Sequence, residues 1–135
     1  MNAKNRNRLF LTACLLICCP FGLAAVANPK ITGTFSSFEY HRKSGDLTGI
    51  EIRLIPVGSG MKGLVQFAEG GAGELLLVDI VNNGDKVSFT SPPNYKPLTK
   101  FDGVVSRSGL SGTFVYSGGS VEKVFLKRTQ SYWDR

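Results

Sequence analysis

Cysteine is scarce in this chain of 135 residues, because Cys14, Cys18 and Cys19 all lie near its start and no other cysteine follows. The remainder can form no disulfide and offers no thiol nucleophile or thiolate metal ligand. Histidine and tryptophan occur once each, as His41 and Trp133. An ordinary zinc site needs three or four His, Cys or carboxylate ligands, so we expect neither a metal ion nor a cofactor.

Motifs of catalysis are also lacking. There is no Gly-x-Ser-x-Gly nucleophile elbow, and the Gly-rich segment 70–73 lacks the Gly-Lys-Ser/Thr ending of a phosphate-binding loop. Paired carboxylates can serve a glycosidase, but none here is flanked by an aromatic platform for a sugar. His41 lies in a charged hairpin, and we expect it to be exposed. Asp79 lies in the most apolar segment, and we expect it to face water at the rim. We therefore expect no enzyme activity.

The first 27 residues have the pattern of a secretory signal peptide. Lys4, Arg6 and Arg8 form a positive n-region, and the segment 9–27 is apolar and ends in Ala25-Val26-Ala27. Small residues at the first and third of these last positions are what signal peptidase reads. We predict cleavage after Ala27, and hence a periplasmic or secreted protein.

Two alternatives compete with cleavage. The segment 9–27 is near the minimum length for a membrane anchor, although Pro20 and Gly22 interrupt it. A lipoprotein would need a small residue before the modified cysteine, whereas Ile17 precedes Cys18 and Cys18 precedes Cys19. We therefore favour a cleaved leader with no stable membrane anchor.

Removal of the leader changes the charge of the chain. Residues 28–135 carry 13 basic and 10 acidic side chains and no cysteine. Their longest basic runs are Arg42-Lys43 and Lys127-Arg128, so the sequence does not favour a nucleic-acid partner. This length suffices to bury a core without disulfides.

Alternation of apolar and polar residues predicts one all-β domain over residues 28–135. No long window repeats at helical spacing, whereas apolar residues alternate in short runs bounded by Gly, Pro, Asn or Ser. In the run 74–81 both faces are largely apolar, so we expect both to be covered. We predict eight strands, at 31–40, 47–57, 63–68, 74–81, 86–91, 98–106, 110–116 and 121–128.

Short turns connect these strands and predict the topology. Asn83-Gly84 favours a type I′ hairpin, and the segment 70–73 is typical of a flexible hairpin loop. Short hairpins pair sequence neighbours antiparallel, and such a meander leaves two exposed edges unless it closes. We therefore predict a small up-and-down β-barrel of about eight strands, with a β-sandwich as the alternative.

An apolar residue followed by any residue and then Gly recurs near strand starts, ending at Gly33, Gly49, Gly63, Gly103 and Gly112. Glycine inside a strand marks a sharp bend or a close backbone approach, which supports closure. We expect a filled interior, because six phenylalanines occur at positions predicted to point inward. They are Phe35, Phe67, Phe89, Phe101, Phe114 and Phe125.

Two short motifs resemble known barrels of the calycin type. Gly33-Thr34-Phe35, together with Arg128 on the last strand, is similar to the lipocalin pattern in which an early Gly-x-Trp packs beneath an Arg. The segment Leu110-Ser111-Gly112-Thr113-Phe114 is similar to the Leu-x-Gly-x-Trp segments of avidin-type barrels. Phe replaces Trp in both motifs. The avidin site relies on several Trp side chains, so the resemblance implies a small secreted barrel and not biotin binding.

Three spots combine aromatic and basic residues in predicted loops, and such residue types often carry protein interfaces. We predict partner contacts at Tyr40 and Arg42, at Tyr95 and Lys96 in a proline-stiffened loop that holds the tyrosine outward, and at Tyr132 and Trp133 in the tail. The alternative for the tail is that Trp133 plugs one mouth of the barrel.

Two classes of function remain open. The first is an exported module that binds another protein, as an enzyme inhibitor or an immunity protein does. The second is a carrier that encloses a small apolar ligand, since an eight-stranded barrel is just wide enough for one. The bulky inward rings favour the binding module.

Overall fold

Nine β-strands and one short 3-10 helix form the part of the chain that the computed structural model describes, residues 28–134. The strands are β1 (Gly33–Ser36), β2 (Glu39–His41), β3 (Asp46–Val57), β4 (Gly60–Gly70), β5 (Ala72–Asn83), β6 (Lys86–Thr90), β7 (Thr99–Val105), β8 (Gly109–Tyr116) and β9 (Val121–Thr129), and the helix η1 spans Tyr132–Asp134. The predicted leader, with its cleavage point after Ala27, lies outside the described residues. Within residues 28–134, no helix has the length and apolar character needed to span a membrane.

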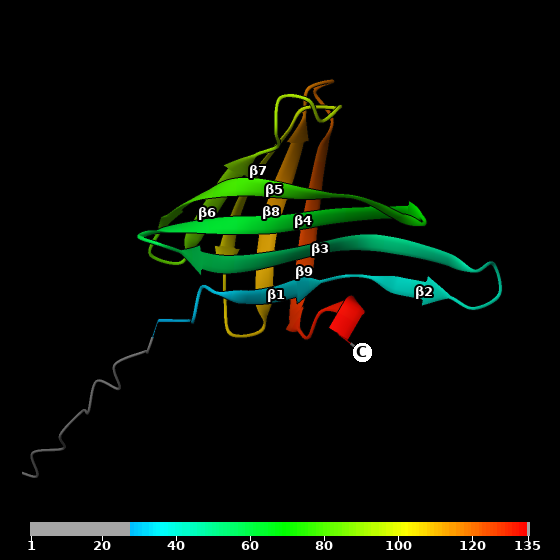
Figure 1. Ribbon diagram of the computed structural model, residues 1–135, viewed down its shortest axis with the longest axis horizontal. Helices are drawn as coiled ribbons and strands as arrows, with labels where there is room; N and C mark the ends of the chain where they lie inside the picture. Colours follow the sequence, from blue (N-terminus) through cyan, green and yellow to red (C-terminus); the bar gives the residue numbers. More distant parts are fainter. Residues whose placement is uncertain (1–27, 135) are drawn as a thin grey trace, which may run out of the picture.

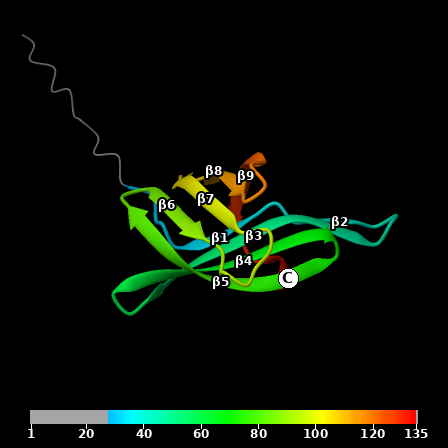
Figure 2. The same cartoon turned by 90° about the horizontal axis from the view of Figure 1, so that it is seen from above.

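Eight of the strands form a closed antiparallel barrel, which confirms the predicted fold. Each strand from β3 to β9 pairs with its sequence neighbour, and β1 closes the ring by pairing with both β9 and β3. In Figure 1 the long strands β3, β4 and β5 run across the view, and β7, β8 and β9 cross behind them at a steep angle. β2 lies outside the ring and pairs with β3 alone, at the end of the molecule away from β6 (Figure 2).

The predicted first strand is in fact divided into β1 and β2. Both halves pair with β3 in one continuous register, but the ladder is altered at Ser37. The Ser37 amide donates to the Ile50 carbonyl at 2.9 Å, whereas the Ile50 amide donates to the Ser37 hydroxyl at 3.0 Å. Opposite this break, Gly49 has a φ of +111°, and a Cβ there would lie 2.4 Å from the Ser37 carbonyl oxygen. Glycine at position 49 therefore permits the break between β1 and β2. Only β1 then pairs with β9 and closes the ring.

The other glycines of the apolar-x-Gly repeat also lie at close approaches. At each of the five positions an added Cβ would come within 3 Å of another atom. Gly103 and Gly112 face each other across β7 and β8, and the Phe101 ring covers both. The repeat thus follows from packing, as expected for glycine inside strands.

Aromatic rings fill the centre of the barrel. Phe35, Phe101 and Phe114 are almost completely buried, and the rings of Phe101 and Phe114 lie 4.7 Å apart. Phe89 stacks on Phe101 at 5.1 Å, and Phe67 meets Phe114 edge-on at 5.4 Å. Burial of each such ring contributes about 1.5–3 kcal/mol to stability.

Phe125 does not belong to this core, and its predicted inward position is wrong. Leu126 is fully buried instead, and half of the Phe125 surface faces solvent on the outer wall. The sequence is ambiguous at this point because Val124, Phe125 and Leu126 are all apolar. Since side chains alternate between faces, a shift of one residue exchanges the two sides.

The prediction that both faces of β5 are covered is also wrong. Its outer face is open, because Leu75 and Leu77 are 56% and 57% exposed. The segment 70–73 lies at the expected hairpin, since β4 ends at Gly70 and the antiparallel β5 starts at Ala72. Asp79 faces water, as expected, and pairs with Lys62 on the outer wall.

The turn after β5 differs from the predicted type I′ hairpin by one residue. Asn83 pairs with Lys86, so the two turn residues are Gly84 and Asp85. Gly84 has a φ of +61°, and no residue other than glycine has a positive φ in the described chain. Positive φ at the first turn residue alone is the pattern of a type II′ turn.

Candidate partner-binding surfaces

Charge is distributed unevenly between the two halves of the barrel. Residues 30–85, which form β1 to β5, carry five basic and seven acidic side chains. Residues 86–129, which form β6 to β9, carry seven basic and two acidic ones. An acidic partner would therefore be attracted to the β6–β9 half.

The outward side chains of β6 to β9 form three rows, each of which crosses all four strands. One row is polar and contains Ser88, Asp102, Thr113 and Lys123. The rows on either side combine lysine with apolar side chains. They contain Lys86, Val104, Ser111 and Phe125 in one case, and Thr90, Lys100, Val115 and Val121 in the other.

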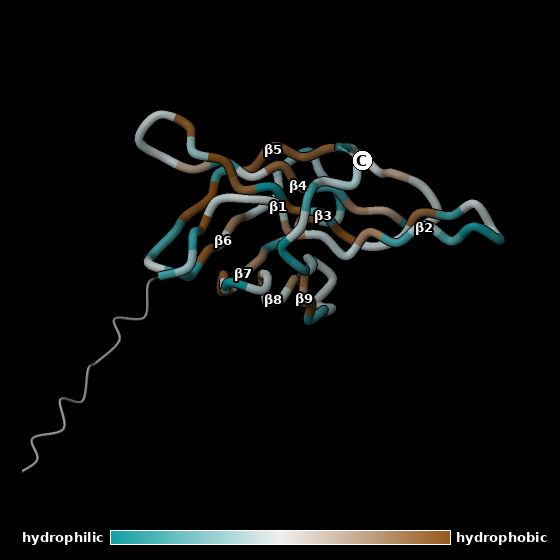
Figure 3. Tube along the Cα trace, turned by 90° about the horizontal axis from the view of Figure 1, so that it is seen from below, coloured by the Kyte–Doolittle hydropathy of each residue, from teal (hydrophilic) through white to brown (hydrophobic). Residues whose placement is uncertain are grey.

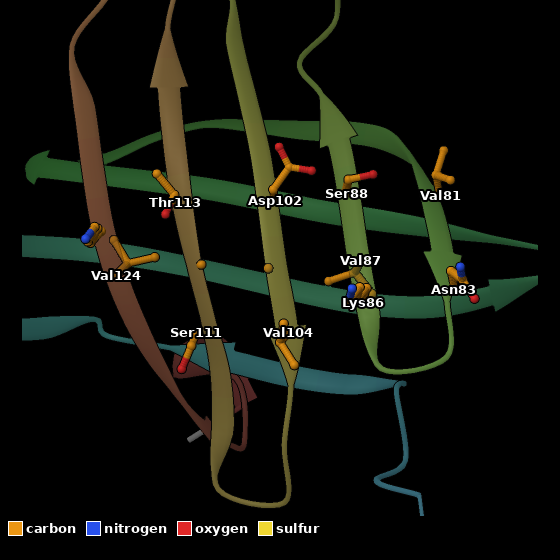
Figure 4. Close-up of a pocket in the computed structure, with 13 residues that line it drawn as sticks. Val81, Asn83, Lys86, Val87, Ser88, Asp102, Val104, Ser111, Thr113 and Val124 are labelled. Atoms are coloured by element: carbon orange, nitrogen blue, oxygen red, sulfur yellow. The ribbon is translucent and has the colours of Figure 1, made fainter.

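A groove of about 670 Å³ follows the polar row, and Figure 4 shows it from the outside. In this view the side chains of Ser88, Asp102 and Thr113 lie on three adjacent strands. The paired glycines Gly103 and Gly112 also line it, at positions where an added Cβ would point inward to the Phe101 ring. Exposed apolar groups flank the groove, since Phe125 is 50% and Val121 60% exposed. We call this surface, the outward residues of β6 to β9, the lysine face.

Tyr95 does not project into solvent as the prolines around it led us to expect. It is half-buried, and its ring stacks on Phe67 with the centroids 6.2 Å apart. Phe67 in turn touches the central Phe114 ring. The loop 91–98 therefore packs its tyrosine against the core, while the neighbouring Lys96 is exposed.

A second tyrosine lies near Tyr95. The Tyr116 hydroxyl donates to the Glu122 carboxylate at 2.7 Å, and its ring stacks on Phe114. Burial raises the pKa of Tyr116 well above its ordinary value of 10, and the hydrogen bond to Glu122 raises it further. Burial, and then the charges of Glu69 and Glu74, also raise the pKa of Tyr95. Both phenols therefore lose their protons only at a more alkaline pH than an ordinary tyrosine does.

The tail lies on the outer wall of the barrel, over β3 and β4, and does not plug a mouth. The Ser131 hydroxyl and the Tyr132 amide donate to the two carboxylate oxygens of Glu51, at 2.5 and 3.0 Å. Glu51 is only 5% exposed. The Trp133 indole donates to the Gln66 side chain at 2.8 Å, yet 55% of Trp133 remains exposed.

The three predicted spots are only partly brought together. Phe38, just before β2, meets the rings of Tyr132 and Trp133 edge-on, so the first hairpin and the tail are neighbours. Trp133 and Tyr95 contact consecutive residues of β4, Gln66 and Phe67, which point to opposite faces. One continuous surface of all six predicted residues is therefore not formed.

The first hairpin is exposed at its tip. Tyr40 is 52% exposed, and His41 and Arg42 also face solvent. The imidazole Nε2 of His41 lies 3.0 Å from the Thr48 hydroxyl on the paired strand. Within residues 28–134 no three His, Asp or Glu side chains converge on a point that could hold a metal ion.

Comparison with protein-family models, with curated proteins and with solved structures finds no match for this chain. The lysine face was missed by reasoning from the sequence. Its lysines are spread over four strands, and they share one surface only through the register of the sheet. A count of charges on either side of residue 85 would have shown the asymmetry.

Proposed function

We propose that this protein is an exported, non-enzymatic β-barrel module that binds another protein, as an inhibitor or an immunity protein does. The partner presents an acidic surface or segment, and the lysine face receives it. The observation that carries the proposal is a groove of about 670 Å³ on a sheet with exposed lysines and exposed apolar side chains.

The charges of the lysine face favour an acidic partner. Four lysines point outward from β6 to β9, and Asp102 is the one acidic residue at the outward positions of these strands. Complementary charges speed association and suppress wrong partners, whereas apolar anchors at the centre of an interface supply most of the affinity. Phe125 and Val121 offer such anchors beside Lys123.

The shape of the face favours a protein over a lipid bilayer. A planar membrane cannot enter a groove, whereas a convex loop or an extended segment of a protein can. A carrier of a small apolar ligand is the less favoured alternative, because phenylalanine rings occupy the centre of the barrel. Export is proposed from the leader pattern, and mass spectrometry of the exported protein should find Asn28 at its N-terminus.

Partner capture with matched variants tests the proposal. The purified protein is immobilised and exposed to the periplasmic or secreted fraction, and captured proteins are identified and quantified. We expect Lys123→Glu to reduce capture of the specific partner, and Phe125→Ala to weaken its affinity by roughly thirtyfold, the effect of an anchor worth about 2 kcal/mol. High salt should also reduce capture.

The control variant is Lys30→Glu, which makes the same charge change at an exposed residue outside the lysine face. It should capture the partner as the wild type does. Equal losses for Lys30→Glu and Lys123→Glu would show a nonspecific charge effect and would contradict the proposed surface.

A further inference from the structure

The barrel contains one strand edge that no other strand pairs with. β4 pairs with β5 along most of its length, but β6 pairs only with Val81–Asn83 at its end. Among the described residues, no strand pairs with the β6-side edge of β5 between Ala72 and Ile80. An additional groove of about 260 Å³ lies where β5 and β6 separate, lined by Asp79 and Val81 on one side and Ser88 and Phe89 on the other.

The turn after β5 determines which residues direct their backbone groups toward this edge. Asn83 and Lys86 close a two-residue hairpin, so they exchange backbone hydrogen bonds. Every second residue back from Asn83 then directs its amide and carbonyl to the same side. Beyond Val81 these residues are Asp79, Leu77 and Leu75, whose backbone groups meet no partner strand.

The same three residues point outward. Leu75 and Leu77 are more than half exposed, and β5 is brown over most of its length in Figure 3, which marks apolar residues. Proteins usually protect a long apolar edge strand with proline, inward charges or a bulge. Here Gly73 and Glu74 of β5 together oppose Phe67 of β4 and form a bulge near the start of the strand. Residues 75–80 contain neither a bulge nor a proline. The regular edge of β5 from Leu75 to Ile80 is therefore open to pairing with another strand.

We propose that a second copy of this chain supplies that strand, through antiparallel pairing of the two β5 edges about a two-fold axis. Between Leu75 and Val81, residues with odd numbers must then face residues with odd numbers, because only these direct hydrogen-bonding groups toward the edge. The edge is thus self-complementary, as an isologous interface requires.

One register satisfies both the charges and the apolar side chains. With Leu75 opposite the second copy's Leu77, the leucines of both chains form two cross-strand pairs on the outer face. Asp79 then lies opposite the bulge of the second copy, beyond the regular part of the edge, and keeps its own partner, Lys62. A shift by two residues in either direction would leave only one leucine pair, and in one direction it would place Asp79 opposite Leu75. A shift by one would turn the leucines to the other face.

The dimer is independent of the proposed function, because it uses β5 and not the lysine face. Analytical ultracentrifugation of the purified protein over a concentration series tests it. We expect the wild type to convert from monomer to dimer with rising concentration. Leu77→Lys should remain monomeric, because a lysine would replace both leucine pairs of the proposed register. A wild type that is monomeric throughout would overturn the proposal, including the case in which another protein supplies the strand.

Val121→Lys is the matched control, since it places a lysine at an equally exposed apolar position on another strand. It should dimerise like the wild type, and circular dichroism should show that both variants are folded. Loss of the dimer in both variants would show that added charge alone prevents association and would overturn the role of β5.

Oxidative crosslinking tests the register separately and does not depend on Leu77→Lys. In a background in which Cys14, Cys18 and Cys19 are replaced by serine, the double variant Leu75→Cys, Leu77→Cys should form a disulfide-linked dimer. Each single variant should not, because its new thiol faces a leucine. A crosslink in either single variant would overturn the register, and no crosslink in the double variant would overturn the pairing.

Discussion

The guanidinium carbon of Arg128 lies 4.6 Å from the centroid of the Phe35 ring, and the two residues face each other across the β1–β9 pair. Nη1 of Arg128 donates to the Thr32 carbonyl at 3.0 Å, and Nη2 donates to the carbonyls of Lys30 and Ser106 at 2.6 and 3.1 Å. One side chain therefore links the segment before β1, the last strand and the β7–β8 turn. The resemblance to lipocalin-type barrels implied an Arg packed on an early aromatic ring, and this contact is present with Phe in place of Trp.

Arg128→Lys should destabilise the protein, because an ammonium cannot reproduce the planar fork of donors that reaches three carbonyls. Loss of hydrogen bonds from a charged donor predicts a decrease of about 1–3 kcal/mol in the free energy of unfolding, measured by denaturant titration. Lys127→Ala, at the neighbouring exposed position, should change it by less than about 0.5 kcal/mol. An effect of Arg128→Lys as small as that of Lys127→Ala would show that the guanidinium hydrogen bonds do not stabilise the barrel.

Phe114→Ala should be far more destabilising than Phe125→Ala. Phe114 is completely buried among four other aromatic rings, and its removal leaves a cavity that costs about 3–5 kcal/mol. Phe125 is half-exposed, so its truncation should cost about 1 kcal/mol or less. Thermal and denaturant unfolding of both variants provide the comparison. A small loss for Phe114→Ala would indicate a loosely packed interior and favour the carrier alternative.

Most of the fold follows from local patterns in the sequence. Alternation and short turns predicted the eight segments of the ring, because each signal depends on neighbouring residues alone. Phe125 was misplaced because three consecutive apolar residues leave the register undetermined, and only the pairing of Ser111 with Phe125 fixes the outer face. The break at Ser37 depends on Gly49, which lies on another strand, so the alternation of the first segment could not show it.

The candidate surfaces were harder to predict than the strands. The proline-rich loop around Tyr95 predicts that this residue is exposed. Its position depends instead on stacking with Phe67, which is distant in the sequence. The docking of the tail depends in the same way on Glu51 and Gln66. Such contacts require the three-dimensional arrangement, because no spacing in the sequence encodes them.

Tyr116 should make the protein lose stability at alkaline pH. Its pKa is raised in the folded state, so above pH 10 the unfolded chain releases this proton first and is favoured. The stabilisation is fully present below pH 10 and decreases as the pH rises through the pKa of the folded state. Denaturant unfolding across this range should show a smaller decrease for Tyr116→Phe than for the wild type. Identical decreases would show that Tyr116 does not carry the effect.

Glu51→Gln should loosen the tail. Both carboxylate oxygens of Glu51 accept hydrogen bonds from the tail, and an amide offers only one acceptor oxygen for these two donors. Trp133 is the one tryptophan of the chain, so its fluorescence reports directly on the tail. We expect red-shifted emission in Glu51→Gln, and an unchanged spectrum in the exposed control Glu39→Gln. Equal emission in both variants would show that Glu51 does not hold the tail in place.

Tyr95 and Trp133 lie outside the lysine face, so variants at these positions test whether the contact with the partner extends to the loop 91–98 and to the tail. Tyr95→Ala removes a ring that packs on Phe67, so it should lower the melting temperature even without a partner. Tyr95→Phe keeps the stacked ring and removes only the hydroxyl, so a loss of capture in this variant reports on contact with the partner. We expect weaker capture with a melting curve close to that of the wild type.

Trp133→Ala should weaken capture more strongly, because 55% of Trp133 is exposed and a partner can bury it. An anchor of this kind is worth about 2 kcal/mol or more, which corresponds to a roughly thirtyfold loss of affinity. Gln66→Leu separates the contact between Trp133 and the partner from docking of the tail. It removes the hydrogen bond that docks the indole, but the Trp133 side chain is still present. It should capture the partner nearly as well as the wild type. If Trp133→Ala lowers the melting temperature but leaves capture intact, the ring serves only to dock the tail, and the interface lies elsewhere.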